Sequence, residues 1–350
     1  MLCYGTRPQV IKASVIRRAL ERRFEVLAVD SGQHYDYELN GLLYRQLDVP
    51  PPDHYLEVGS GSHAEQTASI LVRTERLIAE TKPAAVVVIG DTNSTLAAAL
   101  AAAKCRVPVV HVEAGLRAAD ALMAEELNRR IVDSCARVLC TPCASATARV
   151  RRERADAVVV ETGDVARDVL LAALRTVPGS VEMPARPYIY ATLHRAELTD
   201  DVPLLEAVLV TLASLAMPVV LAVHPRTAAR LGGIDRMHRF GSGLQLRRAV
   251  GYMESLALIG RASAVITDSG GVQREAYWLG VPCLTLRRET EWLETVEAGA
   301  NRVVPPEAHD QLAGAVREAV DSPRAWDRDA YGAGGAAERV ADAVAVLLRS

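Results

Sequence analysis

The sequence predicts an α/β protein made of two similar halves, each with a parallel sheet, and three observations lead to this. The chain has 350 residues, too many for one small module and suited to two domains of about 150–180 residues each. Short β-branched runs alternate with helical stretches, which is typical of parallel sheets covered by helices on both faces. This alternation breaks once, around Pro178-Gly179 and residues 184–187, and then starts again.

The alternation assigns the elements in order. In the first half we expect strands at 2–4, 24–29, 84–89, 108–112, 137–139 and 157–161, and helices at 9–22, 64–80, 93–103 and 124–135. After a helix at 165–174 and the connection, we expect strands at 188–192, 218–223, 244–246, 264–267 and 283–286, and helices at 202–215, 252–261 and 272–279. The final helix, 336–348, is amphipathic and is expected to pack back across the domain junction. The expected domains are therefore 1–164 with 337–350, and 165–336, and ligands are expected at the carboxyl ends of the strands, in the cleft between the halves.

Composition excludes several classes of function. The 40 basic and 43 acidic side chains leave a net charge of −3, which argues against nucleic acid as the main partner. No uncharged apolar run reaches the roughly 18 residues of a membrane span, and no basic flank leads into an apolar segment at the N-terminus. We therefore expect a cytoplasmic enzyme with no membrane partner.

The six cysteines do not predict a disulfide framework in a chain of this length. Cys140-Thr-Pro-Cys143 has the CxxC form of a redox pair or of half a zinc site. No second CxxC or HxxxH completes four zinc ligands, and the motif closes an apolar run rather than opening a helix after a strand. We therefore expect a structural role for these cysteines and no metal site.

The segment from Gly5 to Lys12 follows the first strand and enters a helix. Pro8 suits the first helical turn, where its missing N–H costs nothing. Arg7 would stand at the helix N-terminus and Lys12 about one turn further; Lys12 is one of only three lysines in the chain, which indicates a need for a compact ammonium. Free N–H groups, the helix dipole and two cations form a good anion site, and a solvated helix start is the alternative.

Carboxylates stand at the ends of two neighbouring strands and at the start of the next helix. Asp91 follows the strand at 84–89, Glu113 follows the strand at 108–112, and Glu125 opens the helix after it. An N-cap alone would explain Asp91, and the helix dipole alone would explain Glu125. Three carboxylates at one sheet edge indicate a cluster able to exchange protons.

The second half offers an imidazole and a glycine-rich turn. His194 follows its first strand, and a structural histidine is the alternative. Ser269, Gly270 and Gly271 follow a strand and open a helix, where glycines let backbone N–H groups approach a phosphate; a plain turn is the alternative. Glu275 lies one helical turn further, placed to accept hydrogen bonds from ribose hydroxyls. Neither a GxGxxG fingerprint nor a GxxxxGK[ST] loop is present, which disfavours a nicotinamide cofactor and ATP hydrolysis.

Taken together, these motifs resemble the non-hydrolysing UDP-N-acetylglucosamine 2-epimerases over nearly the whole chain. The matching segments are Gly5-Thr-Arg-Pro-x-x-x-Lys12, Gly32-Gln-His34, Gly90-Asp-Thr92, His111-Val-Glu-Ala-Gly-Leu-Arg117, Glu125-Glu-x-Asn-Arg129, His194-Arg-x-Glu197, Thr267-Asp-Ser-Gly-Gly271 with Glu275, Glu291 with Glu294-x-Val-Glu-Ala-Gly299, and Tyr331-Gly-x-Gly334. The resemblance implies a glycosyltransferase-B-like fold of two Rossmann-like domains, a homodimer, and reversible inversion at carbon 2 of a UDP-sugar without a metal or cofactor. The reaction would eliminate UDP to a 2-acetamidoglucal and add it back.

The resemblance also implies a role for each candidate residue. Catalytic roles are implied for Asp91, Glu113, Glu125 and His194. Substrate binding is implied for Arg7 and Lys12 at the diphosphate, for Ser269, Gly270 and Gly271 at a phosphate, and for Glu275 at the ribose.

Several details look more like the archaeal-type and UDP-diacetamido-glucuronate branch, namely Gln9, Gly32-Gln-His-Tyr-Asp-Tyr37 and Thr290-Glu-Trp-Leu-Glu294. We expect UDP-GlcNAc as substrate, with UDP-2,3-diacetamido-glucuronate, whose carboxylate could pair with Arg288, as the alternative.

Three other functions stay open, namely hydrolysis to free ManNAc, glycosyl transfer, and a non-catalytic sensor of nucleotide sugars. In bacterial members the region of Gln33 and His34 resembles an allosteric UDP-GlcNAc site. Asp36 would repel a diphosphate there, so no strong allosteric activation is expected.

Overall fold

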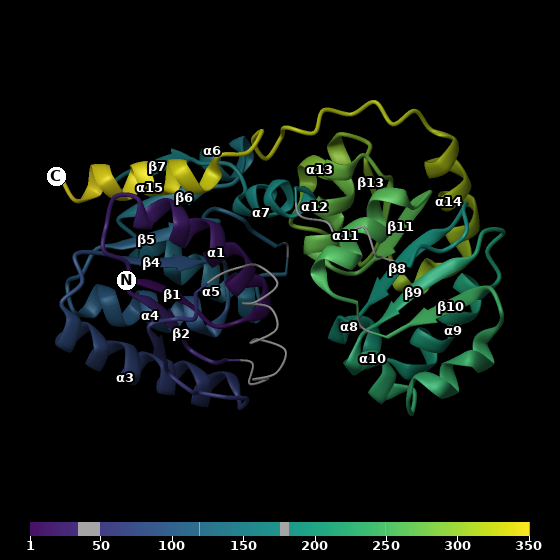
Figure 1. The fold of residues 1–350 in the computed structure, drawn as a ribbon, viewed down its shortest axis with the longest axis horizontal. Coiled ribbons are helices and arrows are strands. Elements are labelled where there is room, and N and C mark those ends of the chain that lie inside the picture. Colours follow the sequence, from purple (N-terminus) through teal and green to yellow (C-terminus); the bar gives the residue numbers. More distant parts are fainter. Residues whose placement is uncertain (34–49, 119, 176–181, 249, 350) are drawn as a thin grey trace. The chain divides into compact units, whose positions relative to one another are not determined.

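The computed structural model describes residues 1–33, 50–118, 120–175, 182–248 and 250–349. Their contacts group the chain into two units, Met1–Ala173 with Ala330–Ser350, and Leu174–Asp329 (Figure 1). The sequence places the boundary before helix α7 (Val165–Leu174), whereas the contacts group nearly all of α7 with the first unit. The reason is local: the carboxylate of Asp168 on α7 accepts hydrogen bonds from the backbone N–H groups of Gly335 and Ala337.

In its described part, the first unit contains a parallel sheet with strand order β3-β2-β1-β4-β5-β6-β7. The strands are β1 (Leu2–Tyr4), β2 (Ala28–Asp30), β3 (His54–Tyr55), β4 (Val86–Ile89), β5 (Val109–Val112), β6 (Val138–Thr141) and β7 (Val158–Glu161). The helices besides α7 are α1 (Arg7–Glu21), α3 (His63–Thr81), α4 (Asn93–Lys104), α5 (Ala124–Cys135), α6 (Ala144–Glu153) and α15 (Ala336–Leu347).

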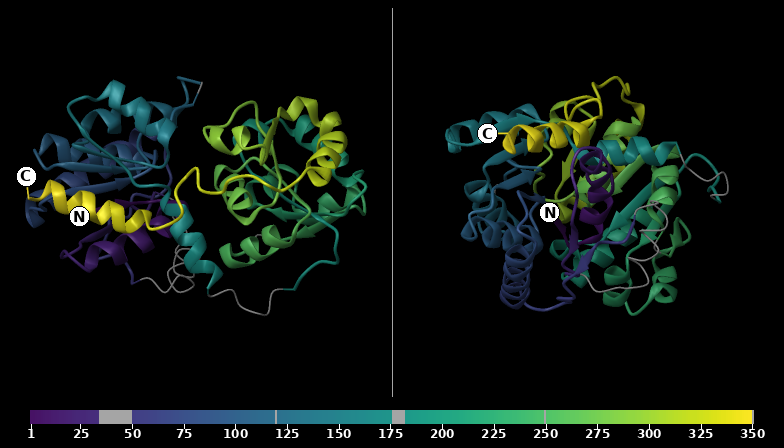
Figure 2. Two further views of the ribbon diagram at one scale, coloured as in Figure 1. Left: turned by 90° about the horizontal axis from the view of Figure 1, so that it is seen from above. Right: turned by 60° about the vertical axis from the view of Figure 1, so that its left-hand side comes forward.

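Strand β4 shows why the buried strands of this sheet are continuous apolar runs in the sequence. Val87 and Ile89 belong to a core shared with α1 and the C-terminal helix α15, which packs against α1 (Figure 2). Val86 and Val88 belong to a second core shared with α3 and α4. Because successive side chains point to opposite faces, a strand covered on both faces needs apolar residues at every position.

The described part of the second unit repeats the plan with strand order β10-β9-β8-β11-β12-β13, again parallel. The strands are β8 (Ile189–Leu193), β9 (Val219–Val223), β10 (Leu244–Arg247), β11 (Ala264–Thr267), β12 (Cys283–Leu286) and β13 (Asn301–Val304). The α-helices are α8 (Ala196–Thr199), α9 (Val202–Ala213), α10 (Pro225–Arg230), α11 (Tyr252–Arg261), α12 (Gly270–Leu279), α13 (Leu293–Glu297) and α14 (Leu312–Asp321); η1 (Ile234–Phe240) and η2 (Pro306–Gln311) are 3₁₀ helices.

The CxxC motif differs from its expected setting. Cys140 lies in β6 and Cys143 is the N-cap of α6, so the motif does open a helix after a strand. Both side chains are buried and all six cysteines are free thiols. Burial raises the pKa of Cys140 to about 12, so this thiol is held protonated and unreactive at neutral pH. In the ranges the structure describes, no three His, Cys, Asp or Glu side chains are grouped to hold a metal ion.

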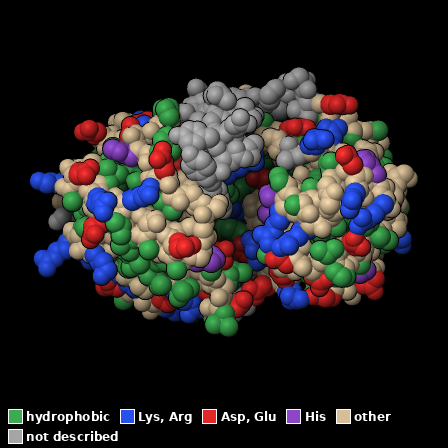
Figure 3. All heavy atoms as spheres, turned by 90° about the horizontal axis from the view of Figure 1, so that it is seen from below, with side chains coloured by type: hydrophobic (Ala, Val, Ile, Leu, Met, Phe, Trp, Pro, Cys, Tyr) green, Lys and Arg blue, Asp and Glu red, His purple; other side chains and the backbone are tan. Residues whose placement is uncertain are grey.

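The surface carries charges of both signs. On the face drawn in Figure 3, acidic and basic side chains are both scattered over each unit. Among the described helices, none combines the length and apolar character needed to cross a bilayer.

Candidate functional site

The loop after β1 is fixed to the end of β4 by Gln9. The side-chain Oε1 of Gln9 accepts a hydrogen bond from the backbone N–H of Gly5 at 2.9 Å, and its Nε2 donates to the carbonyl of Ile89 at 2.6 Å. Gly5 has no room for a side chain, because a Cβ there would lie 2.3 Å from Oγ of Ser94. The chain therefore enters α1 in one fixed direction.

Of the two cations predicted on α1, Lys12 forms an ion pair and Arg7 is exposed to solvent. Lys12 Nζ lies 2.6 Å from Oε1 and 2.7 Å from Oε2 of Glu113, and both side chains are largely buried. Arg7, the first residue of α1, is exposed. The ammonium thus joins the first helix to the carboxylate that follows β5.

Glu113 lies on a strained turn directly over Gly90. Its φ of +69° is in the left-handed region, which costs a non-glycine residue roughly 1–2 kcal/mol. Gly90, with φ of +68°, lies beneath it, and a Cβ on Gly90 would come within 3.2 Å of Oε2 of Glu113. Strain of this kind persists where surrounding contacts over-determine the conformation, and it gathers at functional sites.

Asp91 is not the N-cap of α4. That position belongs to Thr92, whose side chain accepts a hydrogen bond from the backbone of Thr95. Oδ2 of Asp91 accepts from both Nε and Nη2 of Arg129, at 2.9 and 2.6 Å, while Nδ2 of Asn128 donates to the Asp91 carbonyl at 2.8 Å. With 30% of its side chain exposed, Asp91 is a carboxylate that is fixed by one cation and still open to solvent.

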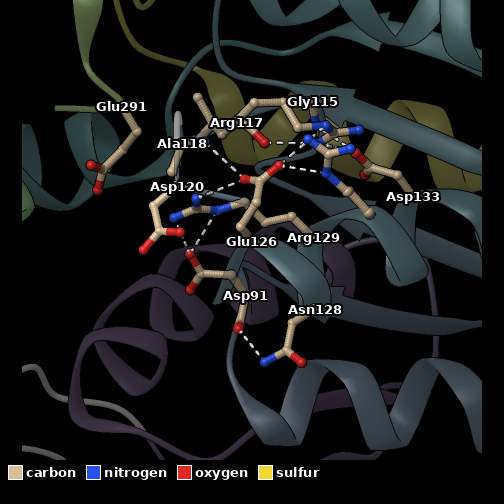
Figure 4. Close-up of polar contacts among 12 residues, drawn as sticks. Asp91, Gly115, Arg117, Ala118, Asp120, Glu126, Asn128, Arg129, Asp133 and Glu291 are labelled. Carbon is tan, nitrogen blue, oxygen red and sulfur yellow. Dashed lines mark hydrogen bonds and ion pairs between the residues drawn. The ribbon is translucent and has the colours of Figure 1, made fainter. Parts of the chain in front are cut away.

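The cation that holds Asp91 is itself held by a buried glutamate (Figure 4). Oε2 of Glu126 lies 3.3 Å from Nη1 of Arg129 and accepts from the backbone N–H of Ala118 at 2.8 Å. Glu126 is fully buried, whereas the preceding Glu125 is exposed. The sequence analysis chose Glu125 and assigned no role to Glu126, Asn128 or Arg129. The i,i+3 spacing of Glu126 and Arg129 is a signal that could have found this pair.

In the second unit, a buried aspartate anchors the backbone at His194. Oδ2 of Asp268 accepts from the backbone N–H groups of His194 and Arg195, at 2.7 and 2.8 Å, and its Oδ1 lies 3.3 Å from Nδ1 of His194. The ring of His224 lies beside that of His194, with centroids 5.1 Å apart and the ring planes tilted by 30°. Asp268 follows β11 directly, and the sequence analysis gave it no separate role.

The glycine-rich turn forms the N-terminus of α12. Ser269 is the N-cap, and its side chain accepts from the backbone N–H of Val272. A Cβ on Gly270 would lie 2.8 Å from Nε1 of Trp292, so this position requires glycine, whereas Gly271 has space beside it. Glu275 lies one turn further along α12 and is half-buried. Such a helix start offers backbone N–H groups to an anion.

Within each unit, the structure brings some of the predicted residues together. Lys12 and Glu113 are in contact, and Asp91 follows the neighbouring strand of the same sheet. In the second unit, His194 and Ser269 follow the adjacent strands β8 and β11.

The region resembling an allosteric site is only partly described. Gln33 is buried, and its side chain accepts from Oγ of Ser94 at 2.7 Å. His34 and Asp36 lie outside the described residues.

Comparisons with known proteins match this chain over most of its length. Residues 18–345 match the family model for UDP-N-acetylglucosamine 2-epimerase. A UDP-2,3-diacetamido-2,3-dideoxy-D-glucuronate 2-epimerase of Pseudomonas aeruginosa is 39% identical over 356 aligned residues, covering 98% of each chain. A UDP-N-acetylglucosamine 2-epimerase homolog of Methanococcus maripaludis is 40% identical, covering 86% of this chain and 87% of its own.

A solved structure agrees in fold. The Methanocaldococcus jannaschii UDP-GlcNAc 2-epimerase, crystallised with UDP-GlcNAc and UDP, superposes with a TM-score of 0.89 at 35% identity, covering 100% of this chain and 98% of that one. The two parallel sheets with their covering helices are the Rossmann-like domains of a glycosyltransferase-B-like fold. The chain belongs to the UDP-N-acetylglucosamine 2-epimerase family.

Proposed function

We propose that this protein inverts carbon 2 of a UDP-N-acetylhexosamine, interconverting UDP-GlcNAc and UDP-ManNAc. A carboxylate takes the proton from carbon 2, the bond between carbon 1 and the UDP oxygen breaks, and a double bond forms between carbons 1 and 2. UDP leaves with the bonding electrons. In the return step a proton is delivered to the opposite face of carbon 2 and UDP adds back to carbon 1. No oxidant or reductant enters the balance.

The observation that carries this proposal is the pair of strand-end carboxylates, Asp91 and Glu113, each in an ion pair with a basic side chain. Arg129 fixes the position of the Asp91 carboxylate, and Lys12 fixes that of Glu113. Inversion requires a proton acceptor on one face of the sugar and a proton donor on the other. Asp91 and Glu113 are our candidates for these two roles. Glu125, exposed in the first turn of α5, is a third candidate for proton transfer.

The second unit supports the leaving group in this proposal. The backbone N–H groups at Ser269, Gly270 and Gly271 would hold a phosphate, and Glu275 the ribose. His194, whose backbone is anchored by Asp268, would stabilise charge that develops on the diphosphate as it departs. Arg7 and Lys12 would serve the diphosphate from the first unit. Lys12 would then exchange its contact with Glu113 for one with phosphate.

A second substrate is favoured by one specific comparison. The Pseudomonas relative named for UDP-2,3-diacetamido-2,3-dideoxy-D-glucuronate aligns over 98% of the chain, and the same chemistry on that sugar is our alternative. Arg288, the cation that could pair with a uronate carboxylate, already lies 3.3 Å from Glu197 and contacts Glu307. An added carboxylate would have to compete with both glutamates, so we place UDP-GlcNAc first.

The proposal is tested by incubation of the protein with a panel of UDP-sugars in deuterium oxide. Deuterium should enter carbon 2 of UDP-GlcNAc and of newly formed UDP-ManNAc. Exchange only with the diacetamido-glucuronate would select the alternative substrate. Stoichiometric free UDP with free ManNAc would show hydrolysis, and exchange with none of the sugars would refute epimerisation.

Two further expectations belong to the same proposal. We propose that the protein works as a homodimer, which sedimentation equilibrium tests directly, and that it acts in the cytoplasm. The homodimer rests on the family resemblance, and the location rests on the sequence alone.

A further inference from the structure

His111 is a buried histidine to which the proposed reaction assigns no part. It lies on β5, two residues before Glu113, and its side chain is fully buried. Its Nδ1 lies 2.7 Å from Oδ1 of Asp133 on α5, and its Nε2 lies 2.8 Å from the carbonyl oxygen of Gly90. The ring thus bridges a helix and the turn that follows β4.

Both partners of this ring are acceptors. The carbonyl of Gly90 has no proton to give. Oδ2 of Asp133 accepts from Nη1 of Arg117 at 2.7 Å and from the backbone N–H of Gly115 at 3.1 Å. Burial opposes ionisation of Asp133, but the hydrogen bonds from His111 and Arg117 and the charge of Arg117 outweigh it and lower the pKa of this carboxyl below its ordinary value. Asp133 is therefore an anion with no proton to donate. Each of the two hydrogen bonds of the ring must then use a proton carried by a ring nitrogen of His111.

We propose that His111 is a positioning residue that carries a proton on both ring nitrogens and fixes the turns bearing Asp91 and Glu113. One proton holds the carbonyl of Gly90, the residue directly before Asp91. The other holds Asp133, which anchors Gly115 two residues after Glu113 (Figure 4 shows Asp133, Arg117 and Gly115). One ring thereby braces both strand ends.

This brace explains how the strain at Glu113 is maintained. Both Glu113 and Gly115 have positive φ, +69° and +83°, so the turn needs anchors that do not move. A Cβ on Gly115 would lie 2.7 Å from the carbonyl of Ala146, and Nη1 of Arg149 donates to the Gly115 carbonyl at 2.7 Å. Gly115 is thus held at its N–H by Asp133 and at its carbonyl by Arg149.

The protonation state has a test that does not depend on the reaction. In protein labelled with ¹⁵N-histidine, the His111 ring, assigned by the loss of its signals in His111→Gln, should show a directly bonded proton on both nitrogens at neutral pH. A ring with one bare nitrogen overturns the inference even if the enzyme is active.

The positioning role rests on the proposed function and is tested with two partial isosteres. The amide of His111→Gln reaches the place of Nε2 and can keep Gly90, while that of His111→Asn reaches the place of Nδ1 and can keep Asp133. Each should lower kcat about 10- to 100-fold, because small misplacements of reacting groups are costly, while the Kd for UDP stays within about twofold.

Val132→Ala changes a fully buried residue on α5, next to Asp133. It is the matched control for lost stability. At temperatures well below its Tm it should keep kcat within about twofold. Equal kcat losses in Val132→Ala and the His111 variants, or wild-type kcat in both His111 variants, would overturn the positioning role. A wild-type protein inactive on every UDP-sugar would instead refute the proposed function, with the ¹⁵N result standing.

Discussion

Lys12 Nζ lies between the two carboxylate oxygens of Glu113, at 2.6 and 2.7 Å, and so joins the first helix to the turn after β5. The lysine side chain is 12% exposed and the glutamate side chain 7%, so water screens the pair little. Removal of one partner from such a pair leaves a buried charge without compensation, which costs more than the intact pair contributes.

Lys12→Met should therefore lower the free energy of unfolding by about 3–5 kcal/mol. The double variant Lys12→Met/Glu113→Gln should recover part of this loss, because it removes the orphaned charge. Urea unfolding of the two single variants and the double variant measures the difference. A double variant no more stable than Lys12→Met would show that the pair is not buried as the structure has it.

Asp91→Asn and Glu113→Gln should keep UDP binding and lower the carbon-2 exchange rate by about 10²–10⁴-fold, the usual contribution of general acid–base catalysis. The amides preserve shape, and unfolding curves control for stability. Calorimetry with UDP, run beside the exchange assay, separates binding from turnover. Exchange at wild-type rates in both variants would leave the two carboxylates as supports of the fold.

Glu275→Ala should have the opposite pattern. A ribose contact is made equally in ground and transition states, so its loss weakens UDP binding rather than turnover. One charge-assisted hydrogen bond is worth about 1.5–3 kcal/mol, roughly ten- to a hundredfold in Kd. Glu318→Ala, an exposed change in the same unit, is the control and should bind UDP normally. Equal Kd values for the two variants would remove Glu275 from the nucleotide site.

The sequence predicts most of the long elements, because buried strands and amphipathic helices carry strong apolar periods. It does not predict the helices α6 and α14, each of ten residues. It misses β3 and β13: β3 has two exposed residues, and β13 includes an exposed arginine, Arg302. It also expects a strand at 24–29, whereas β2 begins at Ala28, since its partner β1 supplies only three residues to pair with. Short edge strands depend on a neighbour that the sequence does not reveal.

Helix α5 shows where reasoning from burial fails at the site. Leu127 is 54% exposed, while the adjacent Glu126 is fully buried, the reverse of what hydrophobicity predicts. Burial of Glu126 is compensated by Arg129 and Arg130, both within ion-pair distance. Which of two successive glutamates points inward is decided by these cations, so the sequence could indicate the motif but not the buried member.

The reactivity of the cysteine thiols tests whether the cores of the two units are buried as the structure shows. Burial raises the pKa values of Cys3, Cys140 and Cys283 to about 12, so their thiolates are scarce at mildly alkaline pH. Only Cys105 and Cys135 are partly exposed. Titration of the native protein with a disulfide reagent should therefore modify these two first, and denaturant should release the rest. Rapid modification of Cys140 in the native state, located by mass spectrometry, would contradict the packing of β6.

Asp133 should make the stability of the protein depend on acid pH. Its pKa is lower in the folded state than the ordinary value of 3.8, so the unfolded chain binds its proton first as pH falls. The stabilisation is present in full above that ordinary value and is lost as pH drops through the lower folded pKa.

Urea unfolding between about pH 6 and about pH 3 should show Asp133→Asn less stable than wild type at the upper end, with the difference shrinking towards the lower end. Asp321→Asn, at an exposed position, controls for the removal of any carboxylate and should track the wild type. If the curves for wild type and Asp133→Asn run parallel down to about pH 3, Asp133 is not ionised against His111 and Arg117, and the brace between the two strand ends loses its central anion.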